Sequence, residues 1–270
     1  MALLLLVLLS LGGGMVWNAS ADPVVRRLSF KVKGWPAGAP PMRLVLLSDV
    51  HVAGPDNPPA RVARIVAQVN AHKPDLVLIA GDFVSEKRMA TQWFDAPAAI
   101  APLGALRARH GVIAVLGNHD HWFGAKRVRV ALAAAGIRVI DNGAERVGPL
   151  AIGGVDDDFT DHARLPEALS ALREAKGIPV LLSHSPDVVP EVPDWVPLIL
   201  AGHTHCGQIV LPWYGAIATA SRSGERFRCG VVRAGAHTVI VTAGIGTSIL
   251  PFRLGAPSDY WIIDIGQSPA

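Results

Sequence analysis

Short runs of aliphatic residues, each bounded by turn-forming residues, recur along the chain from residue 44 to residue 265. Continuous apolar runs of this length are typical of strands that are buried on both faces of a sheet. The predicted strands are residues 44–47, 76–80, 112–116, 139–140, 150–152, 180–182, 198–200, 209–211, 239–241 and 261–265.

Helical periodicity lies between several of these runs. The predicted helices are residues 59–72, 125–135 and 164–176. The second and third helices end near Gly136 and Gly177, where a left-handed cap costs little. Strands and helices alternate in the first half of the chain, and strands dominate the second half. This order predicts an α/β protein in which two packed sheets are flanked by helices.

The amino terminus has a different pattern. Residues 3–11 are apolar, and the small-x-small triplet Ala19-Ser20-Ala21 follows after a short stretch of mixed character. The apolar run is too short to cross a bilayer core of about 30 Å, and the triplet suits signal peptidase. Because no basic residue precedes the run, an uncleaved anchor and a buried helix are alternatives. We therefore expect a signal peptide or membrane anchor over residues 1–21, a linker or amino-terminal strand over 22–39, and one domain over 40–266.

Composition narrows the function classes. Half of the 270 residues are apolar and 17% are charged, whereas ordinary soluble domains carry about 25% charged residues. The 25 basic and 22 acidic residues are spread along the chain without a basic run, so nucleic acid is not an expected partner. Two cysteines exclude a disulfide scaffold and a four-cysteine zinc module. In an oxidising compartment Cys206 and Cys229 could pair, and otherwise they are two small buried residues.

Potential metal ligands follow five of the predicted strands, where the carboxyl ends of strands in α/β sheets bind ligands. The five blocks are Ser48-Asp49-Val50-His51, Gly81-Asp82, Gly117-Asn118-His119-Asp120, Ser183-His184 and Gly202-His203-Thr204-His205. Carboxylates, an amide oxygen and imidazoles suit manganese, iron, cobalt or zinc. Two carboxylates, one amide oxygen and four imidazoles make seven potential ligands, which is more than one metal needs. The sequence therefore predicts two metals that share a bridging carboxylate.

The five blocks, in this order, resemble the calcineurin-like metallophosphoesterases, whose pattern is D-x-H, G-D, G-N-H-D/E, H and G-H-x-H. Residues 203–209, 244–248 and 251–253 are similar to a bacterial branch of membrane-associated phosphodiesterases that includes UDP-2,3-diacylglucosamine pyrophosphohydrolase-like enzymes. The resemblance implies a four-layer αββα sandwich of two packed mixed sheets, with the metal site at the carboxyl ends of the strands. It also implies that a metal-bridging hydroxide attacks phosphorus.

The resemblance further implies a role for each site residue. Two divalent metals, with manganese favoured over iron, zinc or cobalt, would be bound by Asp49, His51 and His205 on one side and by Asn118, His184 and His203 on the other, with Asp82 between them. His119 would be a catalytic histidine outside the ligand set, and Asp120 would hydrogen-bond to it and fix its tautomer. Cys206 stands where this branch usually has glycine, and we interpret it as a small substitute rather than a soft metal ligand.

Several expectations concern the substrate and the surroundings of the site. We expect a phosphorylated small-molecule or lipid substrate and a membrane surface as partners, and the sequence does not indicate an oligomeric state. The most specific expectation is hydrolysis of a UDP-2,3-diacylglucosamine-type lipid pyrophosphate in lipid A synthesis. The alternatives are an exported general phosphatase or phosphodiesterase and a non-catalytic metal-binding scaffold. A cleaved leader would place the protein on the periplasmic side, and an uncleaved anchor on the cytoplasmic face of the membrane.

Two further patterns have a structural and a functional interpretation. The aromatic pairs Trp93-Phe94, Trp122-Phe123 and Trp213-Tyr214 would pack in the core, or would line an apolar groove or meet a membrane. The acidic triplet of residues 156–158 is predicted to be a solvated turn, with a loop near the metals as the alternative.

Overall fold

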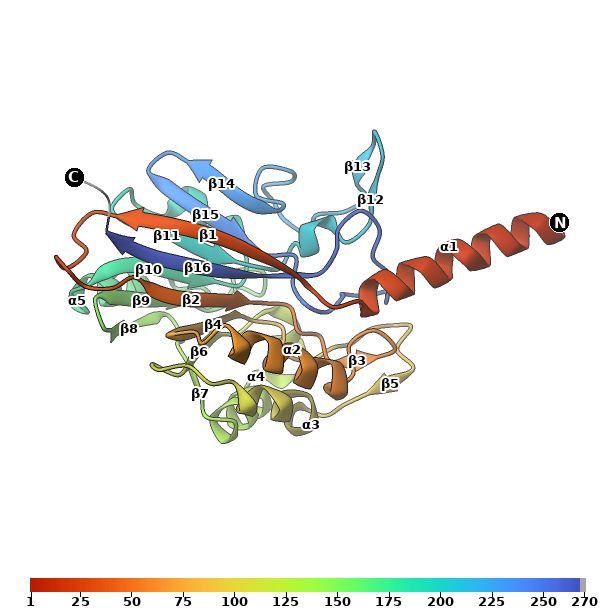
Figure 1. The fold of residues 1–270 in the computed structure, drawn as a ribbon, viewed down its shortest axis with the longest axis horizontal. Helices are drawn as coiled ribbons and strands as arrows, with labels where there is room; N and C mark the ends of the chain where they lie inside the picture. Colours follow the sequence, from red (N-terminus) through yellow and green to blue (C-terminus); the bar gives the residue numbers. More distant parts are fainter. Residues whose placement is uncertain (268–270) are drawn as a thin grey trace.

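Two six-stranded sheets pack face to face in the computed structural model, which describes residues 1–267 apart from the side chains of residues 3, 4, 7 and 8 (Figure 1). The first sheet has the order β1 (Val24–Val32), β16 (Asp259–Gln267), β2 (Met42–Leu47), β4 (Leu76–Ala80), β6 (Val112–Val115) and β7 (Ile137–Val139). The second sheet has the order β14 (Gly230–Ala234), β15 (His237–Val241), β11 (Leu198–Ala201), β10 (Ile178–Ser183), β9 (Leu150–Val155) and β8 (Gly143–Val147).

Helices cover the outer face of each sheet. The first sheet is covered by α2 (Pro59–Ala71), α3 (Ala96–Ile100), the 3₁₀ turn η1 (Ala101–Ala105) and α4 (Asn118–Ala134), and the second by α5 (Leu165–Glu174) and η2 (Pro186–Glu191). The remaining short elements are β3 (Ala53–Gly54), β5 (Gln92–Trp93), η3 (His205–Gly207), β12 (Val210–Leu211) and β13 (Gly215–Ala216). The predicted four-layer αββα sandwich of two mixed sheets is confirmed.

Strand β2 shows why the central strands are apolar throughout. Leu44 and Leu46 lie in the core between the two sheets, whereas Val45 and Leu47 lie in the core beneath the helices. Because successive side chains point to opposite faces of a sheet, a strand in the middle of four layers has no solvent face. Eight of the ten predicted strands therefore overlap interior strands, whereas residues 139–140 overlap the edge strand β7 and residues 209–211 overlap the short hairpin strand β12.

Parallel pairing brings the carboxyl ends of the central strands to one edge of each sheet. β2, β4, β6 and β7 run parallel in the first sheet. β9, β10, β11 and β15 run parallel in the second sheet. The loops after β2, β4, β6, β10 and β11 carry the five predicted blocks, so the fold provides a common rim for them.

Helix α1 (Ala2–Ser20) projects from the body and contacts it near its carboxyl end (Figure 1). The buried guanidinium of Arg61 donates a hydrogen bond to the carbonyl of Ser20 (3.0 Å), and the backbone N–H of Arg253 donates one to that of Met15 (3.1 Å). Elsewhere on this helix, Leu9 and Trp17 are exposed. Within residues 1–267, no helix combines the length and the hydropathy that crossing a bilayer requires.

Two of the three predicted helices need correction at their ends. Helix α4 begins at Asn118, ahead of the predicted start, and Gly124 interrupts it with φ 122°. Gly136 adopts the expected left-handed conformation after this helix, with φ 73°. After α5, however, Lys176 adopts it, with φ 49°. Gly177 is needed for a different reason, because a Cβ there would lie 2.7 Å from the backbone of the neighbouring β9.

Candidate metal centre

Five of the predicted ligands have a strained backbone. The positive φ angles are 50° at Asp49, 43° at His51, 58° at Asp82, 70° at His203 and 50° at His205. A left-handed conformation costs a residue other than glycine about 1–2 kcal/mol, and such strain clusters at functional sites. All five side chains are buried. The loops after three strands therefore adopt an unfavourable conformation that turns these side chains inward.

Asp82 lies between two groups of potential ligands. Its Oδ2 atom is 3.3 Å from Nε2 of His51 and 3.3 Å from Nε2 of His184. On the side of His51, Nε2 of His205 lies 3.2 Å from Nε2 of His51 and 3.4 Å from Oδ1 of Asp49. These atoms come from loops after β2, β4, β10 and β11, so the two sheets meet at this point.

The second group surrounds His184. Its Nε2 atom lies 3.0 Å from Oδ1 of Asn118 and 3.0 Å from Nδ1 of His203. The structure thus brings all seven predicted ligands together, and Asp82 separates the two sets of three that the sequence suggested. Local spacing and position after a strand identified the five blocks, and the family resemblance assigned His119 and Asp120 to other roles.

The outer nitrogens of two histidines are occupied by backbone carbonyls. Nδ1 of His184 lies 2.7 Å from the carbonyl of Ala80, and Nε2 of His203 lies 2.7 Å from that of Ala220. A carbonyl can only accept, so these nitrogens carry the proton when the imidazole is neutral. The inner nitrogen of each ring then has a free lone pair, which is the form that binds a metal.

The polar atoms at the centre lack the partners that burial requires. Oδ1 of Asp49 is buried and has no hydrogen-bond partner among residues 1–267. Burial lowers the pKa of His205 well below its ordinary value, so this imidazole is neutral. Burial opposes ionisation of Asp82, but the charges of His184, His119 and His51 outweigh it and hold the pKa of Asp82 well below its ordinary value. Burial opposes protonation of His184, but the charge of Asp82 outweighs it and raises the pKa of His184 well above its ordinary value. A carboxylate that faces imidazole nitrogens fits a divalent cation, which takes the place of the imidazole proton.

Asp120 does not contact His119 as predicted. Its carboxylate accepts hydrogen bonds from the backbone N–H groups of Asp82 (2.8 Å), Phe83 (2.8 Å) and Gly117 (3.0 Å). Nδ1 of His119 has no hydrogen-bond partner in the described chain. Because Asp120 lies in the first turn of α4, it caps that helix and holds the loop after β4. It is a positioning residue for Asp82, and the expected hydrogen bond to His119 is wrong.

Two neighbours of His119 were not predicted. A carboxylate oxygen of Glu86 lies 3.9 Å from Nδ1 of His119, and Oγ of Ser248 lies 3.2 Å from Nε2. Glu86 is in an irregular segment after β4, and no local pattern distinguishes it. Ser248 lies in the segment 244–248, which was part of the family resemblance. The resemblance pointed to this segment but did not assign a role to Ser248.

Glycines allow the ligand loops to approach one another. A Cβ on Gly202 would collide with the carboxylate of Asp49, and a Cβ on Gly117 would collide with that of Asp82. Each of these glycines directly precedes a ligand, His203 or Asn118. The G-H-x-H and G-N-H-D patterns therefore need glycine because there is no room for a side chain.

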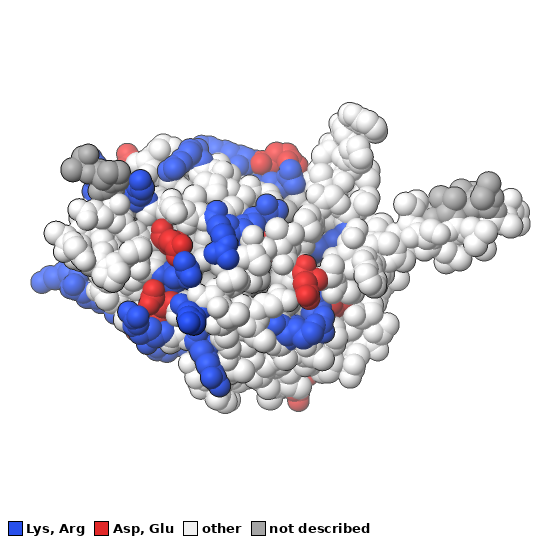
Figure 2. Space-filling model, in the orientation of Figure 1, with Lys and Arg blue, Asp and Glu red and all other residues white. Residues whose placement is uncertain are grey.

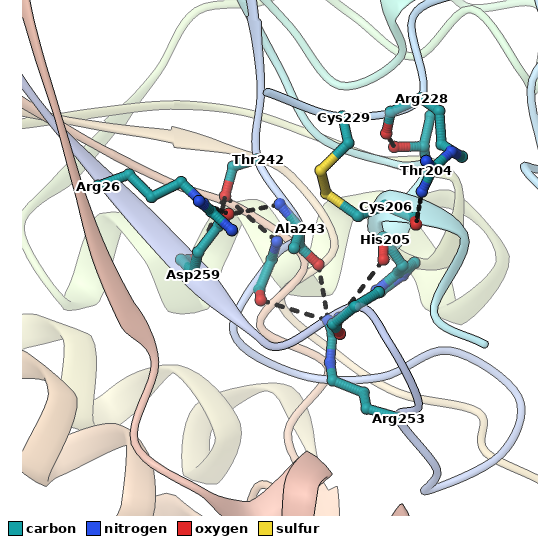
Figure 3. The surroundings of a disulfide bond; sticks show 12 residues. Arg26, Thr204, His205, Cys206, Arg228, Cys229, Thr242, Ala243, Arg253 and Asp259 are labelled. Atoms are coloured by element: carbon teal, nitrogen blue, oxygen red, sulfur yellow. Dashed lines mark hydrogen bonds and ion pairs between the residues drawn. A yellow bond between two sulfur atoms is a disulfide. The ribbon is translucent and has the colours of Figure 1, made fainter. Parts of the chain in front are cut away.

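A disulfide bond joins Cys206 to Cys229, with their Cα atoms 4.7 Å apart (Figure 3). Cys206 directly follows the predicted ligand His205 and has φ 54°, in the left-handed region that favours glycine. The interpretation of Cys206 as a simple small substitute is wrong, because its sulfur is bonded to Cys229. Beside the disulfide, the buried guanidinium of Arg253 donates to the carbonyls of His205 (3.4 Å) and Ala243 (2.6 Å).

The acidic triplet is not a solvated turn. Asp156 and Asp157 are buried at the end of β9. Asp156 forms ion pairs with His121 (2.8 Å) and Arg129 (3.2 Å), whereas Asp157 accepts a hydrogen bond from the backbone N–H of Thr160 (2.7 Å). Asp156 therefore fastens the loop after β9 to helix α4, whereas Asp157 stabilises the turn within that loop.

A cavity of about 330 Å³ opens beside the candidate metal centre. Its polar side includes His119 and four of the predicted ligands, and its apolar side includes Trp122, Phe159, Ile217 and Ile249. The four ligands are Asp82, Asn118, His203 and His205. The ring of Trp122 lies 4.8 Å from that of His119. Trp93, Trp122, Trp213 and Tyr214 are exposed, so the core-packing interpretation is wrong for these four residues.

Comparisons with known proteins identify the family to which the sequence belongs. Residues 42–207, which contain every predicted site residue, match the family described as calcineurin-like phosphoesterase. The "transmembrane protein with metallophosphoesterase domain" of Danio rerio is 30% identical, over 93% of this chain and 59% of that protein. The "uncharacterized metallophosphoesterase YkuE" of Bacillus subtilis (strain 168) is 28% identical, over 95% of this chain and 91% of that protein. A 5'-nucleotidase precursor from Thermus thermophilus superimposes with a TM-score of 0.45 at 15% identity, over 85% of this chain and 55% of that one.

Proposed function

The chain belongs to the calcineurin-like phosphoesterase family, and we propose that it hydrolyses phosphodiester or pyrophosphate bonds at a dinuclear metal centre. One observation carries the dinuclear assignment: Oδ2 of Asp82 lies 3.3 Å from Nε2 of both His51 and His184. A carboxylate at equal distance from two groups of ligands is suited to bridge two cations. Each cation would have its own set of three further ligands.

The residues proposed to hold the metals are Asp49, His51 and His205 on one side, Asn118, His184 and His203 on the other, and Asp82 between them. When bound, two divalent cations activate a water molecule and polarise the phosphoryl oxygens. The mixture of carboxylate, amide and imidazole ligands suits manganese, iron, zinc and cobalt, and among these we propose manganese.

His119 is proposed to assist the leaving group. Burial lowers the pKa of His119 to about 4, so the resting side chain is a neutral imidazole. Its ring lines the cavity next to the ligands, and the imidazole can donate a hydrogen bond to the departing oxygen as charge develops there. Assistance of this kind contributes about 10²–10⁴-fold to the rate.

Substitution of His119 by alanine tests this assignment. We expect H119A to retain both metals and to lose about 10²–10⁴-fold in kcat, because the histidine acts on the leaving group rather than on the metals. The measurements are metal content by mass spectrometry and hydrolysis of bis(p-nitrophenyl) phosphate by the manganese-loaded protein. H110A, at a half-buried histidine outside the site, is the matched control. Loss of a metal from H119A would contradict the role given to this residue.

The proposed substrate carries an apolar part. The cavity beside the metals is lined largely by Trp122, Phe159, Ile217 and Ile249 on its apolar side, which supports a lipid phosphate or pyrophosphate. Within that class we propose a UDP-2,3-diacylglucosamine-type pyrophosphate, as in lipid A synthesis. Parallel assays of this compound, a simple diester and a monoester distinguish it from a general phosphoesterase.

We also propose that one end of the molecule lies at a membrane surface. Residues 1–21 and 206–221 contain no charged residue. Leu9 and Trp17 of α1 and Trp213 of the β12–β13 hairpin are exposed, and both projections are free of charge in Figure 2. Exposed aromatic and aliphatic side chains without charges favour the interface of a bilayer.

Flotation with neutral phosphatidylcholine vesicles tests the membrane proposal. We expect the full chain to bind, because no charged residue of these segments requires an anionic lipid, and a W213S/Y214S variant to bind more weakly. W93S, which removes an exposed tryptophan elsewhere, is the matched control. Equal binding by all three proteins would count against the hairpin.

The disulfide favours a second candidate function. Disulfides persist in oxidising compartments, and a nucleotide-linked substrate is cytoplasmic. The alternative is therefore an exported phosphodiesterase or phosphatase on the periplasmic side of the membrane. Hydrolysis of the lipid pyrophosphate would instead require an uncleaved anchor that keeps the domain in the cytoplasm. A non-catalytic scaffold has no support, because the ligand set and His119 are all present. Thiol trapping of Cys206 and Cys229 in cells separates the two locations.

A further inference from the structure

Of the two polar neighbours of His119 outside the predicted ligands, Ser248 lies closer than Glu86. Oγ of Ser248 lies 3.2 Å from Nε2 of His119, and both side chains line the cavity beside the metals. The other ring nitrogen, Nδ1, has no hydrogen-bond partner within residues 1–267. The contact with Ser248 is therefore the hydrogen bond that can fix the orientation of this imidazole.

The position of Ser248 is fixed in turn by Gln208. The backbone N–H of Ser248 donates to Oε1 of Gln208 (2.8 Å), and Nε2 of Gln208 donates to the carbonyls of Ser248 and Leu250 (3.1 Å each). A side-chain amide that both donates to and accepts from one short segment holds it in a defined place. Gln208 lies three residues after the ligand His205, so it connects the ligand loop to the segment beside His119.

The backbone beside this contact is strained. Gln208 has φ 51° and Ile249 has φ 56°. A left-handed conformation is uncommon for any residue with a Cβ and is a true outlier for a β-branched residue such as isoleucine. Strain of this kind persists where the surroundings over-determine it, and it clusters at active sites. The segment around Ser248 is thus held in place by contacts that outweigh its own preference.

We propose that Ser248, held by Gln208, is a positioning residue that keeps Nε2 of His119 directed into the cavity. In the resting protein the N–H at Nε2 donates to Oγ of Ser248, and during the reaction the departing oxygen replaces Oγ as the acceptor. The inference rests on the proposed function, because it assumes that His119 assists the leaving group. Ser248 replaces Asp120 as the partner that orients the catalytic imidazole. Its hydroxyl acts through His119 and is not assigned a contact with the substrate.

Kinetics with a series of aryl phosphodiesters test the proposal. We expect S248A to lower kcat by about 2- to 10-fold for phenols that leave poorly, the range of one hydrogen bond, and to have little effect for the best leaving groups. Metal content and KM stay unchanged, and S248T, which retains the hydroxyl, restores the rate. Q208L is expected to resemble S248A. S170A, at an exposed serine on α5, is the matched control.

A double-mutant comparison separates positioning from direct action. Residues that act through one another have non-additive effects, so S248A is expected to cause no further loss in the H119A background. An equal loss in both backgrounds would overturn the proposal, because Ser248 would then act without His119. A loss of metal from S248A would overturn it as well.

A spectroscopic measurement makes the test independent of turnover. In the zinc-loaded protein, the ¹⁵N resonance of Nε2 of His119, assigned by its absence from H119A, is expected to shift in S248A and to return in S248T. An unchanged resonance would overturn the proposed contact. If the wild-type enzyme hydrolyses none of the diesters, the proposed function fails, and the resonance still decides whether Ser248 orients His119.

Discussion

Gly202 occupies a position where the absence of a side chain determines where Asp49 lies. A Cβ at this position would collide with the carboxylate of Asp49 and with Ser48. Asp49 is fully buried, so it cannot move toward solvent to make room. The G in the G-H-x-H pattern is therefore a requirement of the metal site and not of the turn alone.

Substitution of this glycine should act on metal affinity. We expect G202A to bind the metal on the side of Asp49 at least about tenfold more weakly, because a displacement of about 1 Å at a preorganised site is enough to cost that much. Metal titration by calorimetry measures the change. G143A, at a glycine where a Cβ would meet nothing closer than 3.7 Å, is the matched control. Unchanged affinity in G202A would mean that Asp49 is not a ligand.

Some residues could be identified from the sequence and others could not. The seven potential ligands were found because ligand chemistry and position after a strand are both local properties. The hydrogen-bond partners of Asp120 could not be predicted, because the backbone of Asp82 and Phe83 comes close to this carboxylate only in the folded protein. Asp156 was interpreted as solvated for the same reason, since its ion pairs with His121 and Arg129 depend on the packing of α4.

Among the connecting elements, the loops after β3 and β4 are joined by a fully buried ion pair. Nζ of Lys87 lies 2.7 Å from the carboxylate of Asp56, and both side chains are inaccessible to solvent. Nζ also donates to the carbonyl of the ligand His51 (3.3 Å). Burial lowers the pKa of Lys87 to about 8, although Asp56 opposes the shift. The pair fastens the loop that carries His51.

Removal of one partner should be more harmful than removal of both. We expect D56N to reduce the free energy of unfolding by about 3–5 kcal/mol, because it leaves a buried ammonium group without its counter-ion. The double variant D56N/K87M should recover part of this loss. Urea denaturation measures the three proteins, with the exposed D95N as a control for loss of a carboxylate. A double variant less stable than D56N would contradict the explanation.

The interior strands could be predicted and two edge strands could not. β2, β4 and β10 are apolar throughout because they have no solvent face. β8 (Gly143–Val147) and β14 (Gly230–Ala234) lie at opposite edges of the second sheet and contain charged residues, so no aliphatic run marked them. The start of α4 was missed because its first turn contains the polar block 117–120.

At the scale of the whole molecule, the candidate metal centre joins the two sheets. Asp49, His51, Asp82 and Asn118 follow strands of the first sheet, whereas His184, His203 and His205 follow strands of the second. Bound metals would therefore connect both halves of the sandwich.

Metal binding should stabilise the entire fold. A ligand that binds only the native state adds about 2.7 kcal/mol when its free concentration is 100-fold above Kd. We expect chelation to lower Tm and added manganese to restore it, as measured by calorimetry. D82N is expected to show a smaller response to the metal. If its response equalled that of the wild type, Asp82 would not be the bridging residue.

The layered architecture could be predicted, but the segments that extend beyond the layers could not. Alternating apolar runs and helical periods indicated two packed sheets with helices outside. The disulfide-linked loop between Cys206 and Cys229 carries the β12–β13 hairpin and a wall of the cavity, and its position depends on contacts that no periodicity reveals.

The position of strand β16 in the first sheet determines when that sheet can be completed during synthesis. It lies between β1 and β2 in the first sheet, although both neighbours are synthesised long before residues 259–267. Pairing between such distant segments closes long loops and slows folding. The segment before β16 also holds the loop of Asp49 in place. The N–H groups of Ile245 and Gly246 donate hydrogen bonds to the carbonyls of Ser48 and Asp49. We therefore expect the loop of Asp49 to reach its final position only after residues 245–267 have been synthesised.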